Sequence, residues 1–411
     1  MEKVYDNNLK NILFINDCIE GYPQIASVRY ENILKILKDK FNITVANDMQ
    51  YGMFKSIYAK ENFKFKTLVS KYTLRADMKN TDTNKKERFI RKTFIVEFWR
   101  YIKKNKIIFN YINRKFYIDL FRYIENNKID LVLVSVPTIY GLYIVEKLKK
   151  EFPYLKIITE ARDILDNNIS GKREWVNKAS EKILLKNSDG IIALTEGIKK
   201  HYNKNFKGPI EVIFNGYDLE KYEDCFPQSI GNKKTLIFSH VGSIYDGRNL
   251  KDTVKAINKF ALDNNKECIL NLVGSLDFKA LEELRECEKF INKVNFKINY
   301  VGPLDNKKAI KYIKESDILI ILTHKNGSDY AIPGKTFEYI GACRPILAVT
   351  KDTYLKNLID NRYGQCAEHN SEDINSKINL ICNRNYDFKH REKYSTKREV
   401  EEIYNFINIL T

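Results

Sequence analysis

The sequence contains few of the residues that mark fibrous, low-complexity or disulfide-linked proteins. Eight prolines and seventeen glycines in 411 residues exclude a collagen-like or low-complexity chain. The seven cysteines are an odd number and form no CxxC pair, so neither a disulfide framework nor a zinc site is expected. Reduced thiols are the simpler interpretation. The five histidines show no metal-ligand spacing either.

Long hydrophobic runs are also missing. The longest apolar stretch, residues 131–145, is interrupted by Ser135, Pro137 and Gly141 and is shorter than the roughly 20 residues of a membrane-spanning helix. The first fifteen residues lack the pattern of a secretory signal peptide. We therefore expect a cytoplasmic protein that, where it meets a membrane, lies on the inner face.

Short apolar runs alternate with helical patterns, and this pattern restarts once. With 44% hydrophobic residues and roughly 100–200 residues per domain, the chain has room for two or three domains. Buried strands that alternate with helices are typical of parallel sheets in doubly wound α/β folds. The expected strands are residues 11–15, 43–46, 131–136, 156–159, 190–194, 210–214, 235–241, 269–273, 297–301, 317–322 and 345–349. The expected helices lie near 27–39, 140–150, 172–187, 249–263, 277–292, 306–315, 333–343 and 371–382.

This pattern predicts an α/β fold of two Rossmann-like domains that face a cleft. We expect an N-terminal domain over residues 1–216, a linker over 217–234 and a C-terminal domain over 235–385. Residues 386–411 are expected to form a C-terminal helix that packs back on the N-terminal domain. In open α/β sheets ligands bind beyond the carboxyl ends of the strands, so the loops at those ends are the first candidates for a site.

Positive charge is concentrated in one region. The chain has 70 Lys and Arg against 53 Asp and Glu, a net charge of +17, and residues 51–130 alone hold 20 basic and 8 acidic residues together with 17 aromatics. Cations interleaved with aromatic rings favour an insertion that binds an anionic membrane surface. One alternative is a solvated insertion whose rings face the core. The other is nucleic-acid binding, but the sequence contains no motif of a known nucleic-acid-binding module.

The strongest candidate loop lies within residues 329–349. Pro333 precedes a helical pattern and is expected in the first turn, where its missing N–H is tolerated. The first amides of a helix favour phosphate, and Lys335 would add a cation there. Glu338, one turn deeper on the same face, could accept two hydrogen bonds from a ribose diol. The alternative is an ordinary surface pair between Lys335 and Glu338.

A second phosphate-type loop follows the expected strand at 235–241. Gly242 permits close approach of the backbone, and Arg248 can hold a diphosphate through its bidentate fork. A glycine turn beside an exposed arginine is the alternative. The first loop of the N-terminal domain, residues 20–29, has a lone glycine and is weaker evidence for a site.

Taken in order, these segments resemble the GT-B glycosyltransferases, and among them family four, the retaining enzymes that use nucleotide sugars. The resemblance covers most of the chain and rests on the joint order of short motifs. The motifs are SDGIIALTE at 188–196, VIFNGYD at 212–218, VGS at 241–243, GRNL at 247–250, LVG at 272–274, VGPL at 301–304, SD at 316–317 and PGKTFEYIGACRP at 333–345.

The resemblance implies a role for each matching position. Glu338 would bind the donor ribose, and Lys335 and Arg248 would neutralise the diphosphate as negative charge grows on it. Two basic side chains and a helix end would take the place of a metal ion, so no metal or cofactor is expected beside the nucleotide-sugar donor. The other implied donor-binding residues are Gly242, Ser243, Gly302, Leu304, Tyr330, Pro333, Gly334 and Thr336.

Two departures from the family pattern affect the expected site. Tyr330 stands in the place of the first of two glutamates, and the neighbouring Asp329 could substitute for it only if the loop shifts. Arg162 and Asp163 stand in the place of a His-Asp pair and could touch the sugar or an acceptor phosphate, or form a buried structural network. The expected catalytic residues are Arg162, Asp163, Arg248 and Lys335, and the expected acceptor-side residues are Gly21, Tyr22, Arg29 and His324.

The implied function is transfer of a sugar from a nucleoside-diphosphate sugar to a hydroxyl, with retention of anomeric configuration and without a metal. The basic aromatic region suggests a lipid-linked or glycan acceptor, as in cell-surface polysaccharide or glycolipid synthesis. One alternative is a non-hydrolysing nucleotide-sugar epimerase of the same architecture. Another is an inactive GT-B-like binding or scaffold protein, which the missing first glutamate favours.

Overall fold

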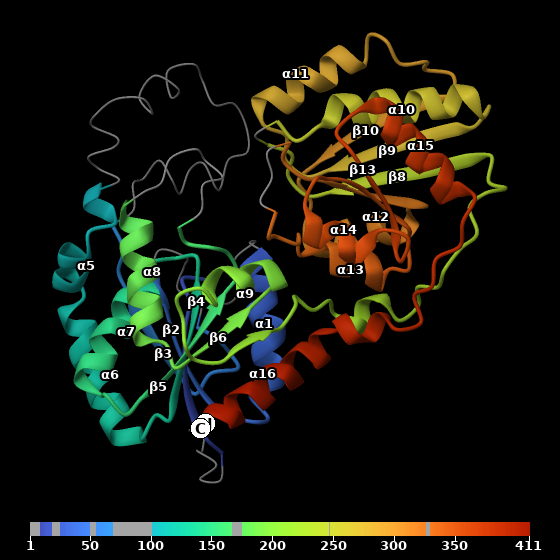
Figure 1. Ribbon diagram of the computed structural model, residues 1–411. Coiled ribbons are helices and arrows are strands. Elements are labelled where there is room, and N and C mark those ends of the chain that lie inside the picture. The colour runs from blue at the N-terminus through green and yellow to red at the C-terminus, as the bar shows by residue number, and fades with distance from the viewer. Residues whose placement is uncertain are drawn as a thin grey trace. The chain divides into compact units, whose positions relative to one another are not determined.

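The computed structural model describes residues 9–18, 25–49, 55–68, 101–166, 175–245, 247–325 and 329–411. The chain divides into two compact units (Figure 1). Unit 1 comprises Met1–Leu194, Ile198–Ile213 and Val400–Thr411, and unit 2 comprises Thr195–Gly197 and Phe214–Glu399. Within the described ranges, no helix combines the length and the apolar character needed to span a bilayer.

Unit 1 is built on a sheet of seven parallel strands in the order β3-β2-β1-β4-β5-β6-β7. The central strands are continuous apolar runs because helices cover both of their faces. The strands are β1 (Asn11–Ile15), β2 (Asn42–Asp48), β3 (Glu61–Phe65), β4 (Leu131–Val136), β5 (Lys156–Ala161), β6 (Gly190–Ala193) and β7 (Ile210–Val212).

Two apolar cores lie on opposite faces of this sheet. Alternate residues of β1 divide between them, because successive side chains of a strand point to opposite faces. Leu13 packs in the core that contains Phe116 and Leu148, whereas Phe14 packs with Tyr30 and Phe406. The helices are α1 (Ile25–Leu37), α5 (Lys106–Ile112), α6 (Arg114–Asn127), α7 (Tyr140–Glu151), α8 (Trp175–Asn187), α9 (Glu196–Tyr202) and α16 (Thr396–Leu410) (Figure 1).

Unit 2 contains a second parallel sheet, in the order β10-β9-β8-β11-β12-β13. Its strands are β8 (Thr235–Val241), β9 (Glu267–Val273), β10 (Phe296–Gly302), β11 (Ile318–Leu322), β12 (Ile346–Val349) and β13 (Gly364–Ala367). Its α-helices are α10 (Leu250–Asp263), α11 (Phe278–Cys287), α12 (Asn306–Glu315), α13 (Lys335–Gly341), α14 (Thr353–Ile359) and α15 (Ser371–Cys382). The expected α/β class with two doubly wound sheets is confirmed.

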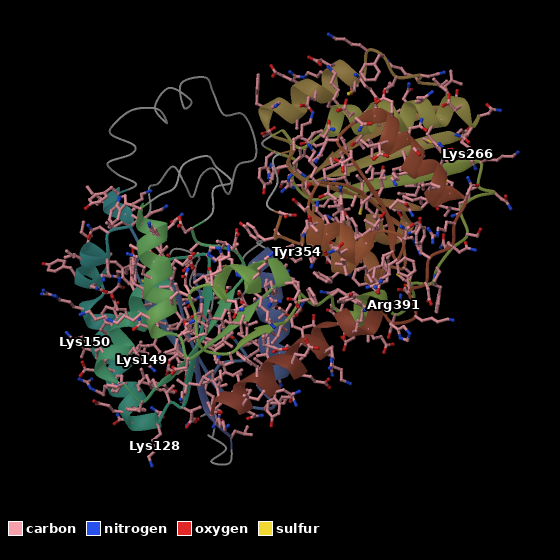
Figure 2. All side chains as sticks on the ribbon, viewed as in Figure 1. Lys128, Lys149, Lys150, Lys266, Tyr354 and Arg391 are labelled. Atoms are coloured by element: carbon pink, nitrogen blue, oxygen red, sulfur yellow. The ribbon has the colours of Figure 1, made fainter. Side chains whose placement is uncertain are left out.

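The segment 217–234, expected to be a linker, contributes to the core of unit 2. Tyr217, Tyr222 and Ile230 are buried there with the strands of the sheet. Arg391, labelled in Figure 2, donates hydrogen bonds to the carbonyl oxygens of Cys225 and Gly341, both at 2.7 Å. The buried tyrosines of this segment therefore contribute to the packing of unit 2. From Val400 onward the chain belongs to unit 1.

The basic aromatic region 51–130 is described only in part. Its strand β3 pairs with β2 at the sheet edge and was not predicted, because its five residues include only two apolar ones and form no continuous apolar run. Phe65, Phe109 and Phe116 are buried in one core of unit 1. In the described part, these three rings face the core, as the alternative of a solvated insertion predicts, while other side chains of the region remain exposed.

Candidate donor site

Lys335 reaches the glycine turn that follows β8. A Cβ atom built on Gly242 would lie 2.9 Å from the Nζ of Lys335, so the lysine side chain passes directly over this glycine. Gly242 has a φ of +135°, a backbone conformation that residues with a side chain rarely adopt, and this φ favours glycine at the position. The structure thus brings together the two loops that the sequence singled out, at the carboxyl edge of the sheet.

His240, near the end of β8, is the hydrogen-bond partner of this lysine. Its Nδ1 lies 3.1 Å from the carbonyl oxygen of Ile320, so Nδ1 carries the proton and donates it. Its Nε2 is then an acceptor for the Lys335 ammonium at 3.2 Å. His240 is buried, and its pKa falls well below the ordinary value because of burial and the nearby charges of Lys335 and Arg248. It therefore stays neutral and keeps its lone pair toward the lysine.

Lys335 itself is perturbed. Burial, followed by the nearby Arg248 guanidinium, lowers the pKa of Lys335 to about 7, while Glu338 acts in the opposite direction. The protonated form of Lys335 is therefore unfavourable in the free protein and becomes favourable when an anion binds beside it. Two cationic groups close together at one loop favour a ligand that brings more than one negative charge.

Arg248 is positioned by the turn between β8 and α10. Its Nη1 donates to the carbonyl oxygen of Ser243 at 3.0 Å, and its Nη2 donates to the Tyr245 hydroxyl at 3.0 Å. The guanidinium also lies 4.2 Å from the centroid of the Tyr245 ring, which His324 contacts on an edge at 5.5 Å. His324, expected on the acceptor side, is therefore placed in unit 2 beside the arginine loop.

Glu338 lies one turn into α13. The Tyr222 hydroxyl is 3.5 Å from its Oε1, at the limit of a hydrogen bond. Burial raises the pKa of Glu338, whereas Lys221, Tyr222 and Lys335 act to lower it. The carboxylate is thus only loosely bonded within the protein and keeps acceptor capacity for hydroxyl groups.

The remaining expected donor residues divide into backbone and buried positions. The hydroxyl of Ser243 pairs with that of Ser275 at 2.7 Å. Gly302 has a φ of +80° and open space around it, so it can approach a flat ligand closely, with Leu304 partly exposed two residues on. Thr336 is fully buried, and its side chain does not reach solvent. Tyr330 accepts a hydrogen bond from the Thr195 hydroxyl at its backbone oxygen, at 2.5 Å.

The start of α13 differs from the prediction. The helix begins at Lys335 with Gly334 as its cap, so Pro333 precedes the helix instead of occupying its first turn. The Thr336 amide donates to Pro333 O at 2.9 Å, which forms a tight turn ahead of the helix. Asp329 accepts from the Thr353 amide at 2.7 Å and thereby caps α14. This bond holds Asp329 at the start of α14.

In unit 1, Arg29 and Arg162 join one buried polar network. Arg29 pairs with Glu160 at 2.5 Å, and both side chains are largely buried. Arg162 donates to the Ser135 hydroxyl at 2.9 Å, and Ser135 in turn donates to Glu160 at 2.9 Å. Tyr30 also donates to Glu160. Burial would raise the pKa of Glu160, but Arg29, Arg162 and Tyr30 hold it below the ordinary value.

Asp17 was not predicted as a candidate. It follows β1 at the carboxyl edge of unit 1 and is buried. Burial and the nearby Asp48 raise the pKa of Asp17 to about 7, although Thr138 and Arg162 oppose the shift. The only available signal in the sequence was its place directly after a strand.

Three other predicted residues of unit 1 remain. Asp163 accepts a hydrogen bond from the Ile164 amide at 2.8 Å. Gly21 and Tyr22 lie outside the described residues.

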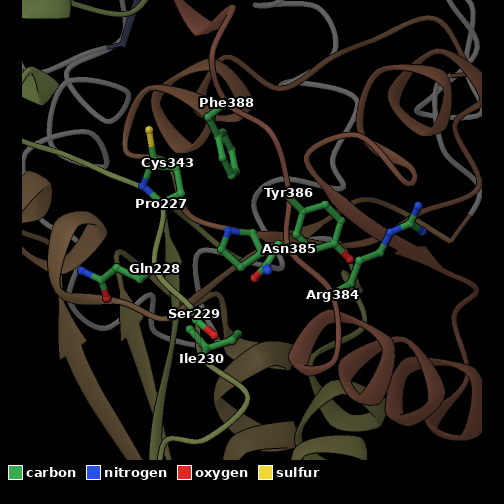
Figure 3. A pocket seen from close by; sticks show the side chains of 10 residues that line it. Pro227, Gln228, Ser229, Ile230, Cys343, Arg384, Asn385, Tyr386 and Phe388 are labelled. Atoms are coloured by element: carbon green, nitrogen blue, oxygen red, sulfur yellow. The ribbon is translucent and has the colours of Figure 1, made fainter.

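A cavity of about 270 Å³ lies elsewhere in unit 2 (Figure 3). It is lined by residues that precede β8 and β12 and by the segment after α15, including Ile230, Tyr386 and Phe388. Because it lies at the amino end of those strands, it is separate from the lysine–arginine loop at the carboxyl edge. Across the part of the chain that the structure describes, no three His, Cys, Asp or Glu side chains gather to hold a metal ion.

Comparison of the sequence with known proteins identifies a distant relative. No family model matches the sequence. A Methanocaldococcus jannaschii protein described as an uncharacterized glycosyltransferase, MJ1069, is 25% identical over 246 residues, which are 56% of this chain and 60% of that protein. The chain therefore matches less than two thirds of that relative's length.

Solved structures match over nearly the whole chain. Anabaena Alr3699/HepE in complex with UDP-glucose has a TM-score of 0.64 at 13% identity, covering 97% of this chain and 99% of that one. The lipopolysaccharide outer core galactosyltransferase WaaB has a TM-score of 0.65 at 14% identity, with 98% and 100% covered. The chain therefore has the GT-B fold. Membership in family four stays a prediction.

Proposed function

We propose that the protein is a glycosyltransferase that takes a sugar from a nucleoside-diphosphate sugar and transfers it to a hydroxyl group. The observation that carries this proposal is the convergence of Lys335 and Arg248 on the glycine turn after β8, with Glu338 one turn away. The named glycosyltransferases of the same fold support it, and the UDP-glucose bound by HepE makes that donor the first to test.

Each of these side chains has a role at a defined point of the reaction. When the bond between the sugar and the diphosphate breaks, negative charge grows on the leaving phosphate oxygen. Lys335 and Arg248 stabilise that charge, because they are held in place before the ligand arrives. The diphosphate raises the pKa of Lys335 and keeps it protonated. Glu338 accepts hydrogen bonds from the ribose hydroxyls and orients the donor.

The finer parts of the proposal concern the acceptor and the stereochemistry. We expect retention of configuration, with the leaving diphosphate assisting the acceptor hydroxyl, and a lipid-linked or glycan acceptor in cell-surface glycan synthesis. Arg162 and the buried Asp17 at the carboxyl edge of unit 1 are the side chains that would meet such an acceptor. We expect no cofactor beyond the donor itself.

A thermal-shift screen of nucleotide sugars tests the donor site without an acceptor. At a donor concentration of about 100 times Kd, binding stabilises the fold by about 2.7 kcal/mol, which shifts the melting temperature by several degrees. Lys335→Ala and Glu338→Gln should reduce the shift and the transfer while the unliganded melting temperature stays similar. Absence of stabilisation by any nucleotide sugar, or wild-type turnover in both variants, would refute the proposal.

Product analysis separates the alternative functions. Incubation with the donor alone would yield an epimerised nucleotide sugar if the protein were an epimerase. Donor binding without transfer to any offered acceptor would favour a binding or scaffold protein. The expected result is neither: slow hydrolysis of the donor alone and transfer when an acceptor hydroxyl is supplied.

A further inference from the structure

Helices α5 and α6 expose a stripe of large apolar side chains. Ile107, Tyr111 and Ile118 have 77%, 64% and 58% of their surface exposed. Ile107 and Tyr111 are four residues apart and share one face of α5, whereas Ile118 lies on α6, after the break between the two helices at Asn113. Each of the two helices thus exposes large apolar side chains on the side opposite to its buried face, and apolar side chains grouped in this way are typical of an interaction surface.

The orientation of these helices is fixed by packing. Phe109, Phe116 and Leu120 lie on the opposite face and are buried in the core of unit 1. Asn113, between the helices, donates to Lys66 O and accepts from the Lys66 amide, at 2.8 and 2.7 Å. The exposed stripe therefore cannot turn inward without removing the buried rings from the core.

Cations accompany the apolar stripe on the same face. The Arg114 guanidinium lies 4.6 Å from the centroid of the Tyr111 ring. Lys115 and Arg122 are exposed on α6, three residues before and four residues after Ile118. Residues 101–128 contain seven Lys and Arg against two Asp and Glu. Glu125 is exposed on the same side of α6, seven residues after Ile118, so this surface carries three cations and one carboxylate. We define the α5–α6 face as Ile107, Tyr111, Arg114, Lys115, Ile118, Arg122 and Glu125.

We propose that the α5–α6 face is a docking surface for an anionic lipid bilayer. Isoleucine and tyrosine side chains would enter the interface, while the flanking Arg and Lys meet lipid phosphates. The combination decides between possible partners. A nucleic acid would use the cations but not the exposed isoleucines. A second copy of the chain would bring two faces of the same positive sign together.

This inference extends the proposed function by naming the surface that would bring the enzyme to a membrane-bound acceptor. The docking surface and the donor site lie on different units of the chain and are tested by different measurements. Donor binding belongs to unit 2, so the donor-induced thermal shift can fail or succeed independently of vesicle binding by unit 1. The two outcomes are measured separately and are not confused.

Vesicle flotation with the full chain tests the proposal. The probes are vesicles of phosphatidylcholine alone and vesicles with about 30% phosphatidylglycerol, at about 0.1 M salt. We expect the wild type to float with the anionic vesicles only. Ile107→Ser with Ile118→Ser, and separately Lys115→Glu with Arg122→Glu, should each reduce the bound fraction about tenfold or more.

Matched variants in unit 2 serve as controls. Val294→Ser removes a side chain that is 86% exposed, and Lys307→Glu with Lys289→Glu makes the same charge change on exposed positions. These variants should float as the wild type does. All variants should keep the wild-type melting temperature and donor-induced shift, which shows that they are folded.

Several results would overturn the proposal. One is a wild type that stays unbound to anionic vesicles, and another is equal binding by the face and control variants. Salt-sensitive binding to duplex nucleic acid that the Ile107→Ser and Ile118→Ser changes do not alter would point to nucleic acid as the partner. A dimer in sedimentation velocity that these same changes dissociate would identify a second copy as the occupant.

Discussion

The titration of Lys335 makes donor affinity depend on pH. With a pKa of about 7, this lysine is about half protonated near pH 7 and only about 1% protonated near pH 9 in the free protein. The diphosphate of a nucleotide sugar carries the same charge throughout this range. Because the anion binds the protonated form best, binding takes up a proton wherever the free lysine is neutral.

The expected Kd for UDP-glucose is constant below about pH 6 and rises above about pH 7, approaching a tenfold increase per pH unit. Isothermal titration in two buffers of different ionisation enthalpy measures both the affinity and the protons taken up. Near pH 7 we expect an uptake of about half a proton per donor bound, and nearly one proton at higher pH.

Two variants give this experiment its control. Lys335→Met lacks the titrating group, so its weaker affinity should change little with pH. Lys335→Arg stays charged and should bind with a flat profile at higher affinity than Lys335→Met. A wild-type profile parallel to that of Lys335→Met would show that Lys335 does not titrate on binding. It would also remove the reason for pairing this lysine with the diphosphate.

Four other changes test parts of the structure. Glu338→Gln should weaken donor binding about 10- to 100-fold, by calorimetry, because hydrogen bonds to a charged acceptor are lost. Glu160→Gln leaves its buried arginine partner uncompensated and should lower the free energy of unfolding in urea by about 3–5 kcal/mol. Asp17 has a raised pKa of about 7, so wild-type stability should fall as pH rises from about 4 to 7, and Asp17→Asn should remove that dependence in pH-resolved thermal unfolding. Gly274→Ala would place Cβ 2.3 Å from a neighbouring carbonyl oxygen at a φ of +137° and should cost more stability than Gly302→Ala, where space is open; equal costs would contradict this reasoning.

The sequence by itself determined the fold class and the position of the donor loops. Continuous apolar strands such as 131–136 require cover on both faces, and that requirement leads directly to parallel sheets between helices. The turn after β8 was found because a glycine at the end of a strand permits close approach of the backbone. The helix that begins at Lys335 was found because a cation beside a helix start favours an anion. The edge strand β3 escaped detection because an edge strand that is only partly buried needs no continuous apolar run, and only two of its five residues are apolar.

Tertiary structure decided which side chains stand together. Nothing in the spacing of His240 and Lys335, 95 residues apart, indicates that one accepts a hydrogen bond from the other. Asp17 becomes a titratable group near neutrality only because folding buries it close to Asp48. The basic aromatic region likewise separates into buried rings and an exposed stripe only once its helices pack. A side chain's charge and its partners depend on solvent exclusion, which distant parts of the chain create together.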